Sequence, residues 1–184
     1  MAKKHWYHVV RDSRLVYKHR ERFAYVWGAN GECPKNYEEA KALVERCWRM
    51  NPEHFQQFVI EAGHTKEELI EHIIGKICFD CSGFVCAVTQ YEGSIYDMRV
   101  LRDYNSTSLR SAFLYPTTPN DGLWGGILWK NGHVAVDGGN GFAYDFGAEF
   151  VDVREYRFVD ADTPTVFTTS GQLPWVDYEF SVNF

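Results

Sequence analysis

The chain has 184 residues, a length that suits one domain with a sizeable core. Hydrophobic residues make up 45% and charged residues 24%, as in ordinary globular proteins, and no apolar run reaches the roughly 18 residues that a membrane-spanning helix needs. The net charge of −6 argues against a general nucleic-acid binder, which would need a basic face for phosphates.

Positive charge is nevertheless concentrated at the N-terminus. Seven basic residues fall within the first 22 positions: Lys3, Lys4, Arg11, Arg14, Lys18, Arg20 and Arg22. A solvated basic edge is the simplest interpretation, and contact with an anionic polymer is the alternative. The first residues lack the apolar stretch of a secretory signal, so we expect a cytoplasmic protein, one released by another route, or a chain whose signal was removed.

Two segments of different character come first along the chain. Residues 5–27 contain short aromatic and β-branched runs and end at the glycine-containing loop 28–31. Residues 33–75 are rich in Glu, Ala, Leu and Lys, which indicates a helical block. Asn36 can cap its first helix, with Glu39 three residues later as in a capping box.

The helical block contains further start and stop signals. Pro52 ends the first helix and can begin a short second one, over about 53–61. Thr65 and Glu68 form another capping box, which opens a helix that Gly75 closes. The block is therefore predicted to hold two or three helices.

The second half of the chain changes from helical to strand-forming patterns. The apolar run 81–90 predicts one more helix. From residue 120 onward, aromatic and β-branched runs alternate with Gly and Asn turns. The predicted strands are 127–130, 133–137, 142–146, 150–159 and 175–184, and we expect the last run to belong to a final strand pair. Helices followed by antiparallel strands define an α+β domain.

The five cysteines do not suggest a disulfide framework, since their number is odd and three are clustered. Cys81 begins the predicted helix 81–90. There the helix dipole is expected to lower the thiol pKa and favour the reactive thiolate. Cys78 and Cys86 are better candidates for core packing.

His133 is the candidate base for this thiol, because imidazole has a suitable pKa and this residue opens a predicted strand after a glycine turn. Asp145 lies on the next strand, across a tight hairpin, where its carboxylate could orient the imidazole. The remaining histidines are interpreted as structural or solvated: His5, His8, His19, His54, His64 and His72.

Three motifs in this order resemble a known family. The segments FDCSGFV (79–85) and GHVAV (132–136) and the upstream Tyr-Val-Trp-Gly (25–28) are similar to the motifs of the NlpC/p-sixty family of cell-wall cysteine peptidases. The motifs anchor about 22–31 and 78–150, over half the chain. The resemblance implies one papain-like α+β domain over 1–184, with the cysteine helix packed on an antiparallel sheet.

The resemblance also implies roles for individual residues. Cys81 would attack a peptide carbonyl, His133 would act as base, and Asp145 would orient His133. The backbone N–H of Cys81 would help hold the oxyanion. The implied substrate-binding residues are Tyr25, Asp80 and Ser82. Asp80 could hold the free amine of a stem peptide, and it could equally be a helix N-cap.

The chain departs from the family pattern in three places. The helical block 33–75 lies between the tyrosine motif and the cysteine, so it is expected to be an insertion that shapes the cleft or binds a partner. Gly126-Ile127-Leu128 stands where relatives tend to have Gly-Asp-Leu, and Asp145 stands where many have His. A substrate loop is expected within 101–108, without an assigned contact residue.

These features predict a peptidoglycan hydrolase that needs no cofactor and cuts an amide in the stem peptide, at the γ-D-glutamyl–diamino-acid bond. The absence of a signal fits a phage-type lysin, or a module delivered by other machinery. The alternatives are an N-acetylmuramoyl-L-alanine amidase and a non-catalytic wall-binding module. A redox Cys-x-x-Cys pair at 78–81, or a zinc site of Cys78, Cys81 and His72, has weaker support.

Overall fold

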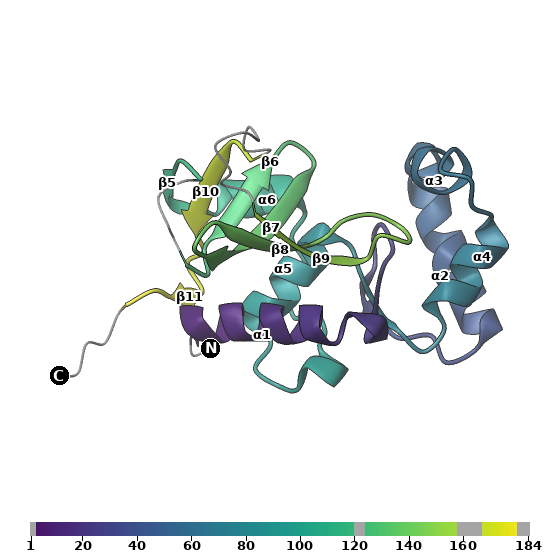
Figure 1. Cartoon of the computed structure of the whole chain (residues 1–184), viewed down its shortest axis with the longest axis horizontal. Coiled ribbons are helices and arrows are strands. Elements are labelled where there is room, and N and C mark those ends of the chain that lie inside the picture. The colour runs from purple at the N-terminus through teal and green to yellow at the C-terminus, as the bar shows by residue number, and fades with distance from the viewer. Residues whose placement is uncertain (1–2, 120–123, 158–166, 180–184) are drawn as a thin grey trace.

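The computed structural model describes residues 3–119, 124–157 and 167–179. Its largest sheet contains β5 (Leu114–Thr117), β6 (Ile127–Lys130), β7 (His133–Gly139), β8 (Phe142–Phe146), β9 (Val153–Arg157) and β10 (Thr169–Gln172). The spatial order is β5-β10-β6-β7-β8-β9, and every neighbouring pair is antiparallel. This sheet forms one end of the molecule and a group of helices forms the other (Figure 1). The predicted α+β class is confirmed.

The hairpin between β7 and β8 is closed as the sequence predicts. Asn140 and Gly141 have φ angles of 54° and 78°, the left-handed conformation that a tight hairpin turn requires. Val136 lies opposite Tyr144 in this pair. Asp145 is therefore placed on the strand next to that of His133.

The two faces of the large sheet have different cover. Side chains that alternate along β7 and β8, such as Val134 and Phe146, pack in the main core with helix α5 (Cys81–Gln90). The opposite face has a smaller cluster of Leu128, Ala135, Ala143 and Phe167. Helix α5 has the bounds predicted for it, and nine of its ten residues are buried.

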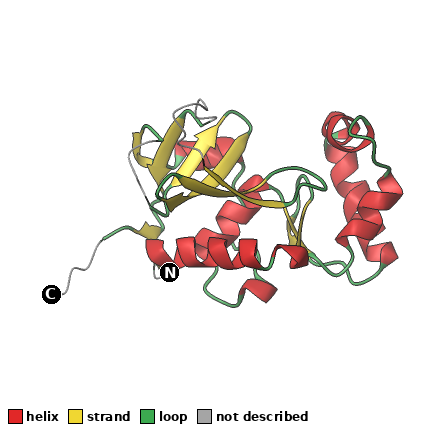
Figure 2. Cartoon of the chain, in the orientation of Figure 1, coloured by secondary structure: helices red, strands yellow, loops and turns green. Residues whose placement is uncertain are grey.

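Residues 6–18 form helix α1 (Trp6–Lys18), which the aromatic and β-branched runs of this segment did not predict. Val9, Ser13 and Val16 are fully buried on one side of it. This buried stripe explains the helix, because burial of one face against the sheet outweighs the weak helix propensity of valine. Figure 2 shows α1 and α5 below the sheet.

The block 33–75 folds as predicted into helices α2 (Tyr37–Met50), α3 (Pro52–Phe55) and α4 (Lys66–Ile73), with a π-helical turn (Gln56–Ile60) continuing α3. The Asn36 side chain accepts the Glu39 N–H at 3.0 Å, and Thr65 with Glu68 forms a complete capping box. The block has its own core, which includes Val44, Phe55 and Leu69.

A three-stranded sheet connects this block to the rest of the chain. It consists of β2 (Phe23–Tyr25), β3 (Asn30–Glu32) and β4 (Ile77–Phe79), with β4 in the centre. Strands β2 and β4 are parallel, and Tyr25 lies opposite Phe79. This register brings the tyrosine motif beside the start of α5, although the helical block separates the two in sequence.

The end of the chain differs from the prediction. Strand β11 (Val176–Asp177) has only two residues and pairs in parallel with β1 (Lys4–His5), while β10 joins the large sheet. The two therefore do not form a pair with each other. A turn separates β10 from β11, in which the Val176 N–H donates to the Leu173 carbonyl. Residues 158, 159 and 180–184 of the predicted strands lie outside the described part.

Shorter helical segments complete the fold: η1 (Arg20–Arg22), η3 (Ile95–Asp97) and α6 (Ser106–Ser111). Across the described ranges, no helix combines the length and the apolar character needed to cross a membrane.

Candidate active site

One cleft, of about 570 Å³, brings together most of the residues singled out from the sequence. Five of them line it: Tyr25, Asp80, Cys81, Ser82 and His133. The sixth, Asp145, is fully buried and contacts His133. Asn105 and Ser106, at the start of α6, also line the cleft, so the expected loop 101–108 does contribute to it.

Cys81 occupies the first turn of α5, and Asp80 is the N-cap of that helix. The Asp80 Oδ1 accepts the Gly83 N–H at 2.6 Å and the Ser82 hydroxyl at 2.9 Å. Its Oδ2 accepts the Gly28 N–H at 3.1 Å, which ties the tyrosine motif to the cysteine helix. Of the two roles considered for Asp80, capping is therefore the one observed.

The electrostatic environment of Cys81 is opposite to the one expected from the helix dipole. Burial, together with the negative charge of Asp80, raises the pKa of the Cys81 thiol to about 12. Backbone N–H groups of Val134 and Ser82 donate to the sulfur and act in the other direction, but burial dominates. The thiol is thus protonated in this conformation, and a base is needed to activate it.

His133 and Asp145 form a short contact across the hairpin. The His133 Nε2 lies 2.6 Å from the Asp145 Oδ2. Because a carboxylate accepts, this contact places a proton on Nε2 and leaves Nδ1 free to act as base. Burial of Asp145 disfavours its charge, but hydrogen bonds from His133 and Arg154 outweigh burial and lower the pKa of the carboxyl.

Arg154 is a further residue of this group that sequence reasoning missed. Its Nε and terminal nitrogen lie 2.8 and 2.6 Å from the Asp145 oxygens, and the Tyr156 hydroxyl donates to the same carboxylate at 3.1 Å. A Cβ at Gly147 would come within 2.6 Å of the Arg154 guanidinium, so the absence of a side chain there makes room for it. The only available signal was the register between β8 and β9, which sets Asp145 opposite Arg154.

Cys81 and His133 share the cleft, but no direct hydrogen bond joins their side chains among the described contacts. The sulfur instead accepts the N–H of Val134, the residue next to His133. Hydrogen bonds between catalytic groups are often long or misaligned in the absence of substrate. The thiol is thus held at the start of β7, next to the base.

Tyr25 is almost completely buried beside the cleft, with 4% of its surface exposed. Burial raises the pKa of its hydroxyl well above the ordinary value, so the phenol stays neutral. The backbone N–H of Tyr25 donates to Asp152 Oδ1 at 2.8 Å.

His54 and Phe58, from the helical block, line the same cleft together with Trp27. His54 was interpreted from sequence as structural or solvated, and it is neither exposed nor remote: its Nε2 lies 2.9 Å from Glu149. Nothing in the local sequence of α3 indicated this contact, because its partner is 95 residues away.

Cys78 and Cys86 are buried in the interior, in agreement with the packing role expected for them. Burial raises the pKa of both thiols, that of Cys86 to about 12. All five cysteines are free. His72, one member of the hypothetical zinc site, pairs with Asp152 at 2.8 Å, and the described residues contain no cluster suited to a metal ion.

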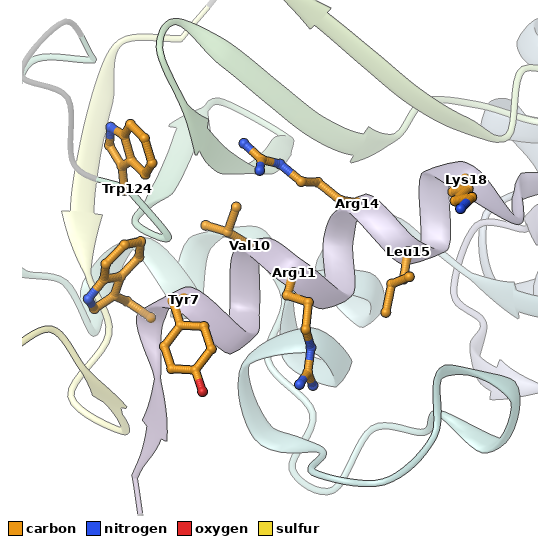
Figure 3. A pocket seen from close by; sticks show the side chains of 8 residues that line it. Tyr7, Val10, Arg11, Arg14, Leu15, Lys18 and Trp124 are labelled. Carbon is orange, nitrogen blue, oxygen red and sulfur yellow. The ribbon is translucent and has the colours of Figure 1, made fainter.

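A second hollow, of about 390 Å³, follows α1 and contains none of the predicted site residues. Its lining includes Arg11, Arg14 and Lys18, with Tyr7 and Trp124 toward one end. In Figure 3 the guanidinium groups of Arg11 and Arg14 extend to opposite sides of the helix. Three of the seven cations noted at the N-terminus of the sequence thus line this hollow, whereas Lys4 is buried and pairs with Asp12 at 2.7 Å.

Comparison with family models, curated proteins and solved structures finds no match to this chain. The function is therefore inferred from the sequence motifs and from the side chains that line the cleft.

Proposed function

We propose that this protein is a peptidoglycan hydrolase of the papain-like, NlpC type, which cleaves an amide bond in the stem peptide. The observation that carries the proposal is the grouping in one cleft of Cys81, at the first turn of α5, and His133, whose Nε2 is 2.6 Å from buried Asp145. A nucleophile, a base and a group that orients the base are the components of acyl-transfer catalysis.

In the first step, the Cys81 proton passes to His133 Nδ1 as the sulfur bonds to the amide carbonyl carbon. The carbonyl electron pair moves to oxygen, which the Cys81 backbone N–H stabilises. Because the pKa of Cys81 is raised to about 12, transfer to the base accompanies attack, and a thiolate is not formed beforehand. The C–N bond then breaks, and the proton on His133 goes to the leaving amine.

In the second step, water attacks the thioester and gives a proton to His133. The C–S bond breaks, the carboxylic acid leaves, and Cys81 recovers its proton. Asp145 stays ionised throughout, because Arg154 and His133 lower its pKa. Its role is to hold the imidazole in the tautomer with a free Nδ1.

The stem peptide is proposed as substrate on the strength of the three motifs, which resemble those of cell-wall cysteine peptidases. The γ-D-glutamyl–diamino-acid bond is the proposed cut. Lys130 supports this assignment, because it places a cation on the cleft, where an acidic peptide with free carboxylates can bind; Arg154 also lines the cleft, but its guanidinium pairs with Asp145. Action on the wall after lysis, or after delivery by other machinery, would bring the enzyme to its substrate.

The decisive experiment is mass spectrometry of purified peptidoglycan digested by wild-type protein and by Cys81→Ala. We expect new amino termini on the diamino acid with the wild type and none with the variant. New sugar ends without peptide would identify an amidase instead. Wall binding by both proteins without any new terminus would indicate a binding module and contradict the proposed hydrolase.

A further inference from the structure

Four neighbouring rings, which we call the aromatic wall, line the cleft. His54 is at its centre: its ring centroid lies 4.6 Å from that of Phe58, 6.0 Å from that of Trp27 and 6.1 Å from that of Tyr25. Two of these residues, His54 and Phe58, belong to the helical block, whereas Tyr25 ends β2 and Trp27 follows that strand. The inserted block therefore supplies part of the cleft that contains Cys81.

This wall is held in place by a buried carboxylate. The Glu149 side chain has no exposed surface, and its oxygens contact His54 Nε2 at 2.9 and 3.2 Å. The same carboxylate accepts the Trp27 N–H at 3.1 Å. These contacts restrict the orientation of the His54 ring and the position of the Trp27 backbone, which lowers the entropy that a ligand must overcome on binding.

Further contacts attach the helical block beside the wall. His72 of α4 lies 2.8 Å from Asp152, and His64 stacks on Phe150 with ring centroids 3.8 Å apart. All three histidines thus contact the loop between β8 and β9. These side-chain contacts, in addition to the two chain connections of the helical block, fix the position of the block relative to Cys81.

The wall remains open to a ligand. Phe58 is 39% exposed although it is a large apolar side chain that lines the cleft. Asn105 and Ser106 line the same cleft and bring hydrogen-bonding groups to it. A cleft that offers both flat rings and polar groups matches a pyranose ring, which has an apolar C–H face and hydroxyl edges. The short aliphatic residues of a stem peptide do not need such a surface.

We propose that Trp27, His54 and Phe58 form a subsite that binds a sugar ring, so that the preferred substrate is a stem peptide still attached to its glycan. This inference rests on the proposed function for the identity of the peptide. It makes the helical block a determinant of specificity and applies whichever amide of the stem is cut.

The test compares two substrates, a free stem peptide and the same peptide linked to an N-acetylated disaccharide. The quantity measured is the kcat/KM for the sugar-linked peptide divided by the kcat/KM for the free peptide. Phe58→Ala should lower this ratio about tenfold, a loss typical of one aromatic contact. Phe58→Leu, which keeps apolar bulk without the ring, should lower it less. Tyr37→Ala is the matched control, because Tyr37 has the same 39% exposure in the same block but does not line the cleft.

A binding measurement keeps the sugar subsite testable if neither substrate is cleaved. The disaccharide alone is titrated into Cys81→Ala protein and into Cys81→Ala/Phe58→Ala by calorimetry. Weaker binding by the double variant supports the subsite even where the proposed hydrolase has failed. Equal binding by both, or an unchanged kcat/KM ratio for Phe58→Ala in an active enzyme, would overturn the inference.

Discussion

The clearest test of the catalytic geometry is Asp145→Asn. The amide has nearly the same size as the carboxylate, but one of its two acceptors becomes an NH₂ donor. Asp145 accepts from Arg154, His133 and Tyr156. At least one of these donors would then face another donor. If the NH₂ takes the place of Oδ2, the imidazole can avoid a donor–donor contact only by moving its proton to Nδ1, which removes the base. If the NH₂ takes the place of Oδ1, only Arg154 Nε faces a donor, but the negative charge that stabilises the protonated imidazole is still lost.

The expected loss follows from the missing negative charge beside the imidazole and, when the NH₂ replaces Oδ2, from the change of tautomer as well. When the orienting carboxylate of such a triad becomes an amide, turnover falls on the order of 10³- to 10⁴-fold. Stability should fall much less, by about 1–3 kcal/mol, since the Arg154 side chain is 41% exposed and can be solvated. For a chain of this size, that corresponds to a melting temperature lower by about 2–10 °C.

The assay is release of new amino termini from peptidoglycan, with thermal unfolding measured in parallel. Asp137→Asn is the control. Asp137 lies in β7 and is buried like Asp145, but its side chain accepts the Gly139 N–H and is not among the contacts of His133. If folded Asp145→Asn keeps more than about a tenth of wild-type activity, Asp145 does not orient the base.

The pH dependence of stability gives a second measurement on Asp145→Asn. The pKa of Asp145 is lowered in the folded chain, so its ionisation stabilises the fold above the ordinary carboxyl pKa. This contribution is lost as the pH falls through the folded-state pKa. The difference in melting temperature between wild type and variant should therefore be largest near neutral pH and should shrink below about pH 4.

Three further predictions concern other groups. Because burial raises the pKa of Cys81 to about 12, its alkylation by iodoacetamide should rise about tenfold per pH unit from pH 7 to 10, whereas a plateau by pH 8 would mean that the thiolate is already formed. Burial also raises the pKa of Asp137 to about 6, so ionisation of this carboxyl destabilises the fold as the pH rises from about 4 through 6. Asp137→Asn removes this penalty, at most about 3 kcal/mol, and should therefore raise the melting temperature at pH 7.5. If the variant gains no more at pH 7.5 than at pH 4, this prediction is wrong. Binding of an anionic polymer in the hollow along α1 would make the slope of log binding constant against log salt concentration smaller by about one in Lys18→Gln. Lys35 is exposed and lies outside that hollow, so Lys35→Gln should leave the slope unchanged. Equal effects of the two substitutions would mean that the cations of the hollow are merely solvated.

Much of the secondary structure was predictable because its signals are local. Asn36 and Thr65 bond to backbone N–H groups three residues on, and the Asn140-Gly141 turn fixes the hairpin that carries His133 and Asp145. Helix α1 was not predictable in this way. Its valines carry weak helix propensity, and only burial against the sheet stabilises the helical form.

Sequence alone determined the identity and order of the candidate nucleophile, base and orienting residue, because motif spacing and hairpin register are properties of neighbouring residues. Tertiary structure decided what surrounds them. The contacts of Glu149 with His54 and Trp27 depend on chain segments that meet only after folding, whereas Arg154 reaches Asp145 through the register of the adjacent strands β8 and β9. The protonation of Cys81 follows the same rule: the helix dipole acts locally to lower its pKa, but burial depends on the whole fold, and burial is the larger effect.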